Sequence, residues 1–106
     1  MIIYVDIDNT ICKTPPNRYD LAKPMKDRIE KVNNLHKAGN KIVYWTARGT
    51  TTGKDWAELT EKQLKKWGCK YHVLEMGKPD YDAFIDDKAF NADNFFNLAI
   101  LKGTTK

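Results

Sequence analysis

The sequence predicts an α/β fold, a parallel, doubly wound sheet arranged in three layers. Two observations predict it. Short apolar runs rich in Ile, Val and Tyr alternate along the chain with segments whose apolar residues recur at helical spacing. Several of these runs end directly in Asp or Thr, and open α/β sheets bind their ligands at the carboxyl ends of their strands. The chain has 106 residues, which suits one domain, 1–106.

The elements follow from the apolar patterns and from the residues at their boundaries. The run before Asp6 indicates a buried strand, because it is apolar throughout. Pro24 suits the first position of a helix that Gly39 ends, and Gly68 ends the next helix. The predicted elements are a strand at 2–6, a helix at 24–38, a strand at 41–45, a helix at 54–67, strands at 71–74 and 82–86, and a helix at 91–101.

The first strand ends in Asp6-Ile7-Asp8-Asn9-Thr10, the most informative stretch of the chain. In an extended backbone, Asp6 and Asp8 would point to the same face. Two such carboxylates repel each other unless a cation, a shared proton or a role in chemistry compensates. The alternative is ordinary turn chemistry, since Asp is common in loops after strands.

Three further polar signals follow in order. Thr46 comes after the second predicted strand, Lys78 lies in a Gly-Lys-Pro loop, and Asp86-Asp87 comes after the fourth predicted strand. The order of these signals resembles the haloacid dehalogenase-like (HAD) superfamily of phosphohydrolases. An acid pair comes first, followed by a hydroxyl, a lysine and a second acid pair. The pattern of that superfamily is DxDxT, a strand-terminal Thr or Ser, a Lys and a strand-terminal acidic pair. The resemblance covers nearly the whole chain.

The resemblance implies a Rossmann-like fold without a cap domain. With right-handed crossovers, the strands would lie in the order third, second, first, fourth, so that the strand at 82–86 lies beside the strand at 2–6. The acid pairs would then share one rim. The polar stretch 11–23 is too long for a tight loop, and the family has a small flap there. Neither this stretch nor the segment between Thr46 and Lys78 has room for a cap.

The resemblance also implies the chemistry. Asp6 would attack phosphorus and form an aspartyl-phosphate, which splits one hard step into two. Asp8 would protonate the leaving group and later deprotonate the attacking water. Thr46 would donate a hydrogen bond to a phosphoryl oxygen, and Lys78 would neutralise charge on the nucleophile and on the transferring group.

Magnesium is the cofactor that the resemblance implies, since Mg²⁺ takes hard oxygen ligands together with substrate phosphates. Asp6 would bridge the ion and the phosphate, and Asp8 would contribute its backbone carbonyl. Asp86 would bind through its side chain, whereas Asp87 is either a further ligand or a neighbour of the ligands.

Four further residues are candidates for substrate binding: Thr10, Arg18, Arg48 and Gly49. Thr10 would support the first loop by hydrogen bonding. Arg18 and Arg48 suit the non-transferred part of an anionic substrate, and a plain surface role is the alternative for each. Gly49 opens a polar Gly-Thr-Thr-Thr-Gly loop that suits a hydroxyl-rich ligand.

These residues predict a magnesium-dependent phosphomonoesterase that acts on a small phosphorylated metabolite. Small capless members of this kind resemble bacterial proteins of capsular polysaccharide or sugar-phosphate biosynthesis, so the resemblance implies a sugar phosphate. A phosphatase for nucleotides or nucleic-acid ends is the first alternative, favoured by basic charge but without an aromatic and basic stripe. A phospho-acceptor signalling domain would need an Asp at the end of the second strand, and none is there. A non-catalytic module is disfavoured because both Asp6 and Asp8 are present.

The composition agrees with an anionic small molecule as the partner. Lys and Arg number 18 against 14 Asp and Glu, which gives a formal charge of +4. No run of basic residues marks a nucleic-acid surface. Cys12 and Cys69 have neither metal-ligand spacing nor a disulfide framework, so we expect reduced thiols in a cytoplasmic protein. No charged leader or long apolar stretch supports secretion or a membrane span. A homo-oligomer is expected, because a neighbouring subunit is the simplest substitute for a cap.

Overall fold

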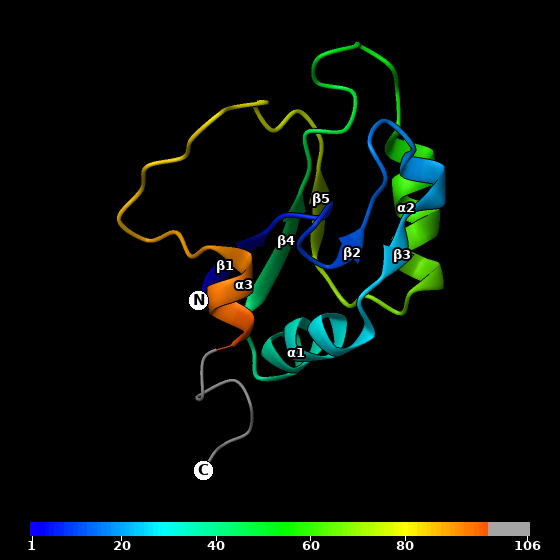
Figure 1. The fold of residues 1–106 in the computed structure, drawn as a ribbon. Coiled ribbons are helices and arrows are strands. Elements are labelled where there is room, and N and C mark those ends of the chain that lie inside the picture. The colour runs from blue at the N-terminus through cyan, green and yellow to red at the C-terminus, as the bar shows by residue number, and fades with distance from the viewer. Residues whose placement is uncertain (98–106) are drawn as a thin grey trace.

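The structure, a computed structural model, describes residues 1–97 and contains a parallel sheet of three strands. These strands are β1 (Ile2–Val5), β4 (Lys41–Trp45) and β5 (Val73–Glu75), with β4 in the middle. Ile2 pairs with Lys41 at one end of the ladder, and Val43 pairs with Val73 on the other side of β4 (Figure 1). The predicted α/β class and the predicted order of these strands are confirmed.

A short antiparallel ladder precedes the first helix and sets where it begins. Strands β2 (Cys12–Lys13) and β3 (Lys23–Pro24) pair with each other, with a 3-10 turn, η1 (Tyr19–Leu21), between them. The backbone N–H of Met25 then donates to the carbonyl of Ile11 at 2.8 Å. Pro24 is therefore part of a strand and does not open the helix, which begins two residues later than the sequence predicts.

The helices are α1 (Lys26–Lys37), α2 (Ala57–Lys66) and α3 (Ala92–Phe96). Helix α2 begins three residues later than predicted, because Asp55 and Trp56 form a turn in which the carboxylate of Asp55 accepts a hydrogen bond from the N–H of Ala57 at 3.0 Å. The end of the helix predicted at 91–101 lies outside the described residues. No helix within 1–97 has the length and apolar character that a membrane span needs.

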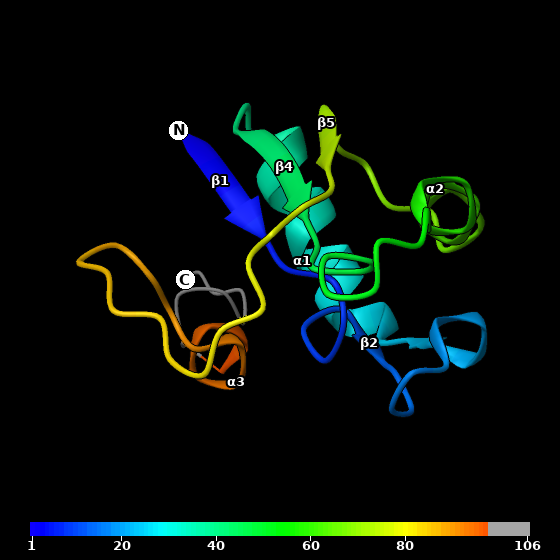
Figure 2. The same cartoon turned by 90° about the horizontal axis from the view of Figure 1, so that it is seen from above.

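One face of the sheet meets the helices. Val5, Ile42 and Tyr44 point to this face and pack in one core with Ile29 of α1 and Phe96 of α3. Seen from above, the strands lie in a row, with α2 beyond β5 and α3 on the side of β1 (Figure 2).

The opposite face of β1 is open to solvent. Ile2 is 66% exposed and Tyr4 is 53% exposed, and both belong to this second face. A third layer is not seen among residues 1–97, so the three-layer, doubly wound arrangement remains a prediction.

The strand predicted at 82–86 is not formed. Residues 76–91 run away from the sheet as a long loop without helix or strand (Figure 1). Within the described chain, β1 pairs only with β4, and its outer edge has no partner. Phe84 and Ile85 are exposed, Ile85 to 99%. The apolar run in this loop is short and lies between aspartates, and Asp is depleted in strands.

Candidate active site

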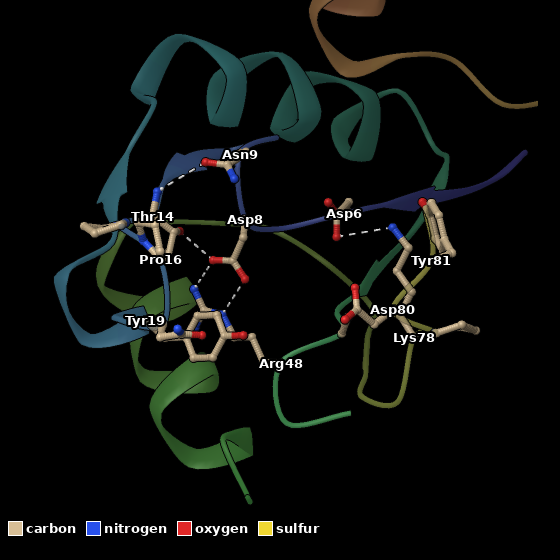
Figure 3. Close-up of a pocket in the computed structure, with 14 residues that line it drawn as sticks. Asp6, Asp8, Asn9, Thr14, Pro16, Tyr19, Arg48, Lys78, Asp80 and Tyr81 are labelled. Atoms are coloured by element: carbon tan, nitrogen blue, oxygen red, sulfur yellow. Dashed lines mark hydrogen bonds and ion pairs between the residues drawn. The ribbon is translucent and has the colours of Figure 1, made fainter. Parts of the chain in front are cut away.

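A cavity of about 310 Å³ opens at the carboxyl ends of β1 and β4, which is the edge where the sequence predicts a site. This volume is at the lower end of the range for small-molecule sites. The cavity is lined from the loop after β1, from the segment before η1, from the turn after β4 and from the loop after β5 (Figure 3). Its polar and charged lining residues are Asp6, Asp8, Asn9, Thr14, Asn17, Tyr19, Arg48, Lys78, Asp80 and Tyr81.

The loop after β1, residues 6–11, holds Asp6 and Asp8 in place through a tight turn, and we call it the acid loop. The carbonyl of Ile7 accepts hydrogen bonds from the N–H groups of Thr10 at 3.1 Å and Ile11 at 3.0 Å. Asn9 has a φ of 61°, a left-handed conformation that Asn tolerates better than most residues. Ile7 and Ile11 are buried in the core. The buried isoleucines fix the loop, and the acids on either side of Ile7 face the cavity.

Asp6 is the more open of the two acids, with 36% of its side chain exposed. The Nζ atom of Lys78 lies 3.4 Å from its Oδ1 atom. The hydroxyl of Thr10 donates to its Oδ2 atom at 3.3 Å. Thr10 thus lies where the sequence places it, as a support of the first loop.

Lys78 is held on its other sides by aromatic rings. Its Nζ atom lies 5.7 Å from the ring centre of Trp45 and 5.3 Å from that of Tyr81. Its side chain is only 12% exposed. The ammonium is therefore a positioned positive charge beside Asp6, as Figure 3 shows.

Asp8 forms a bidentate ion pair with Arg48. Nε of Arg48 donates to Oδ2 at 3.0 Å, and Nη2 donates to Oδ1 at 2.8 Å. The hydroxyl of Thr14 donates to the same Oδ1 at 2.6 Å. Both oxygens of Asp8 are thus engaged, and its orientation is fixed.

The guanidinium of Arg48 is fully buried, with 0% of its side chain exposed. Its Nη1 atom donates to Thr60 at 3.1 Å and to Gln63, both on α2, and the ring of Tyr19 lies 4.9 Å from its Cζ atom. Four of its five N–H groups therefore have protein partners. In the structure Arg48 positions Asp8, whereas the sequence suggests that Arg48 binds the substrate.

Thr46 ties the two charged loops together and does not line the cavity. Its hydroxyl accepts a hydrogen bond from the N–H of Arg48 at 3.1 Å, and its carbonyl accepts one from the N–H of Lys78 at 3.0 Å. It is 1% exposed. In this arrangement Thr46 supports Arg48 and Lys78, and its predicted hydrogen bond to a phosphoryl oxygen remains a prediction.

The second acid pair is not brought to the site. Asp86 and Asp87 are exposed and do not line the cavity, and the Oδ1 atom of Asp86 accepts from the N–H of Lys88 at 2.7 Å within its own turn. Among residues 1–97, no group of three or more His, Cys, Asp or Glu side chains could hold a metal ion. The predicted magnesium ligands are not assembled, because the strand that would carry Asp86 to the edge of β1 is not formed.

Three of the four proposed substrate contacts, Thr10, Arg18 and Gly49, do not line this cavity. Arg18 is exposed and pairs with Asp20 at 2.9 Å, and its hydrogen bond holds the pKa of Asp20 below the ordinary value. Gly49 lines a second cavity of about 380 Å³ next to the first. Sequence patterns missed Thr14, Tyr19, Trp56 and Asp80 as lining residues, since nothing local distinguishes them from loop or core positions.

Both cysteines are buried free thiols, as expected. Burial raises the pKa of the Cys69 thiol to about 11 and also raises the pKa of Cys12. Sγ of Cys12 lies 3.8 Å from Oδ1 of Asp8, behind the acid loop. The thiols belong to the packing around the site and do not line the cavity.

Fold and site together define an α/β protein with two acid–base pairs at the carboxyl edge of a parallel sheet. The chain matches no protein-family model and no curated protein. It is similar to the crystal structure of a structural-genomics target from Vibrio cholerae, with a TM-score of 0.82 and 28% sequence identity over 92% of this chain and 88% of that chain. This likeness concerns the fold and carries no activity.

Proposed function

We propose that the protein is a phosphomonoesterase of the HAD type, which transfers the phosphoryl group of a small metabolite first to Asp6 and then to water. The observation that carries the proposal is the pairing of the open Asp6 carboxylate with the positioned ammonium of Lys78, 3.4 Å away at the wall of a small-molecule cavity. A nucleophile beside a fixed positive charge is what phosphoryl transfer needs.

Asp6 attacks phosphorus, and the bond from phosphorus to the ester oxygen breaks as the new bond forms. Lys78 offsets the negative charge on the phosphoryl oxygens, and a cation held between two rings needs little reorganisation to do so. Thr10 keeps the second oxygen of Asp6 in a fixed direction. Water then attacks the phosphorus of the aspartyl-phosphate, which releases inorganic phosphate and restores Asp6.

Asp8 is the proposed acid and base of the two steps. It gives a proton to the leaving ester oxygen and later takes one from the attacking water. Its side chain is 21% exposed toward the cavity. The fork of Arg48 and the hydroxyl of Thr14 hold it in one orientation as an acceptor, so giving a proton to the leaving oxygen requires one of these donors to turn away from Asp8.

As they lie, the described residues do not fit a magnesium ion. All four carboxylate oxygens of Asp6 and Asp8 have protein hydrogen-bond or ion-pair partners, and no third acid joins them. Dependence on Mg²⁺ and a four-stranded, doubly wound sheet both require 82–86 to pair with the outer edge of β1. Phe84 and Ile85 would point to opposite faces of such a strand, so pairing would bury one of these exposed side chains against the helix-covered face of the sheet.

The proposed substrate is a sugar phosphate, as for the capsule and polysaccharide phosphatases that the sequence resembles. The proposed location is the cytoplasm, and a second subunit could cover the open side of the cavity. Nucleotides remain the alternative substrates. These points rest on the resemblance and on charge.

The test is release of inorganic phosphate from a panel of sugar phosphates and 5′-mononucleotides, with and without Mg²⁺, by wild type, Asp6→Asn and Asp27→Asn. Asp27 is an exposed aspartate in the first turn of α1, so its variant controls for the loss of one negative charge. We expect Asp6→Asn to lose at least about 1,000-fold in kcat, in line with removal of a nucleophile, and Asp27→Asn to match wild type. Turnover by Asp6→Asn within tenfold of wild type would exclude the covalent mechanism.

A further inference from the structure

A second cavity, of about 380 Å³, lies next to the cavity that Asp6 and Asp8 line. The chemistry proposed above does not use it. The two cavities share part of their lining, so they lie next to each other. The residues common to both are Asn17, Tyr19, Ala47 and Asp80. A ligand whose phosphate lies at Asp6 can therefore extend into the second cavity without leaving the protein surface.

A tight turn after β4 builds the far wall of this second cavity. Gly49 has a φ of 82°, and a Cβ atom there would collide with the carbonyl of Lys54 and press on the indole of Trp56. The carbonyl of Gly49 accepts from the N–H of Gly53 at 2.8 Å. The turn thus needs glycine at position 49 to bring Trp56 against the cavity.

Two aromatic rings form an apolar corner. The rings of Tyr19 and Trp56 meet edge to face, with centroids 5.2 Å apart. Arg48 lies over the Tyr19 ring and holds it in place. Nζ of Lys54 is 6.0 Å from the Trp56 ring centre, at the outer limit of a cation–π contact, so it does not compete strongly for the indole.

Hydroxyl, amide and carboxylate groups surround this corner. Thr51, Thr52 and Asn17 line the cavity, and the hydroxyl of Thr51 donates to Oδ2 of Asp80 at 3.2 Å. An aromatic corner offers a surface for the C–H groups of a saturated ring. The neutral polar groups and one carboxylate offer partners for several hydroxyls at once.

We propose that the second cavity binds the alcohol part of the substrate, and that this part is a polyhydroxylated ring of monosaccharide size. The proposal rests on the phosphatase function proposed above. Trp56 packs against the ring, and Asp80 and Asn17 bind its hydroxyls. A nucleobase can stack on a single ring such as that of Trp56, so 5′-mononucleotides are included in the test below as the competing ligands.

The test uses the indole N–H signals of the ¹⁵N-labelled Asp6→Asn protein, which binds without turnover. Inorganic phosphate, a panel of hexose and N-acetylhexosamine phosphates, and 5′-mononucleotides are each titrated. Trp56→Phe assigns its signal. Trp45 reports on the first cavity, since its ring contacts Lys78. We expect inorganic phosphate to shift the Trp45 signal alone, and at least one sugar phosphate to shift both signals.

The outcomes separate the two proposals. If sugar phosphates shift only Trp45, the second cavity does not bind the alcohol part, while the phosphate site stands. If no phosphate compound shifts Trp45, the proposed function fails as well. A shift of Trp56 by mononucleotides alone would replace the sugar ring with a base and overturn the inference.

Kinetics of the active enzyme give a second readout. Asp80→Asn and Gly49→Ala should raise KM for the responding sugar phosphate by about tenfold, which is about 1.4 kcal/mol of binding, and should raise KM for acetyl phosphate, which has no sugar ring, by less. Gly53→Ala is the control for Gly49→Ala, since Gly53 also has a positive φ but open space around it. Equal changes for both substrates would contradict a role in binding the alcohol part.

Discussion

Arg48 binds both carboxylate oxygens of Asp8 from a position in which its own side chain is fully buried. A buried guanidinium is costly to desolvate, and hydrogen-bond partners offset that cost. Here Asp8, Thr60 and Gln63 are partners for four of its five N–H groups, so the acid loop and helix α2 are joined through one side chain. The orientation of Asp8 and the stability of the fold are thus coupled.

Replacing Arg48 with Ala should destabilise the protein strongly, because the change removes the charged partner of Asp8 and takes one hydrogen-bond donor away from the buried side-chain oxygens of Thr60 and Gln63. We expect a loss of about 3–5 kcal/mol in the free energy of unfolding, measured by urea denaturation. Arg18→Ala is the control, since the Arg18–Asp20 pair is exposed and should contribute much less to the free energy of unfolding. Similar losses in the two variants would show that the buried fork does not support the fold.

The acid loop was predictable from sequence because its signals are local. An apolar run must be buried, so the polar residues that follow it lie at the edge of the sheet, and Asp6, Asp8 and Lys78 meet there. The partners of Arg48 were not predictable from position alone. The one available sign was that Thr60 and Gln63 interrupt the apolar face of α2, where a polar side chain needs a buried partner.

The segment 82–86 shows the limit of local patterns. Its apolar residues predict a strand, but a strand forms only when a neighbouring strand accepts its hydrogen bonds. In the described chain it leaves the sheet, and the outer edge of β1 has no partner. The acid pair at its end, and with it the predicted metal site, depends on that long-range pairing.

Lys78 should be essential for turnover. Lys78→Gln removes the ammonium beside Asp6 while keeping a side chain of similar length, so we expect a fall of about 100-fold or more in kcat/KM. Lys88→Gln is the control, because Lys88 is exposed in the loop away from the cavity. A loss in Lys78→Gln no larger than in Lys88→Gln would remove the lysine from the mechanism.

Stability should fall at alkaline pH because of the buried thiols. Burial raises the pKa of Cys69 from 9.0 to about 11. Between these values the unfolded chain has lost the thiol proton and the folded chain still holds it, so the free energy of unfolding decreases as pH rises. Below pH 9 the Cys69 thiol keeps its proton in both the folded and the unfolded chain, so it does not make the free energy of unfolding depend on pH. Urea unfolding of wild type between pH 8 and pH 11 should therefore show a steeper decline than that of Cys69→Ala, by up to about 1.4 kcal/mol per pH unit. Parallel declines would mean that Cys69 is accessible to solvent in the folded state.

The last prediction concerns magnesium binding and residues 82–86, which lie away from the sheet. Ile85 is 99% exposed, so in metal-free buffer Ile85→Asp should change the free energy of unfolding by no more than about 0.5 kcal/mol. Ile42→Ala is the contrasting variant, because Ile42 is completely buried and its truncation should cost about 2–5 kcal/mol. If 82–86 pairs with β1 and Mg²⁺ then binds, Mg²⁺ with inorganic phosphate should raise the melting temperature of the wild type by mass action. Asp86→Asn should lose that rise because it removes a proposed ligand, and Ile85→Asp should lose it because aspartate disfavours a strand at 82–86. A magnesium-dependent rise that persists in both variants would show that 82–86 takes no part in holding the ion, and no rise in the wild type would remove magnesium from the proposed function.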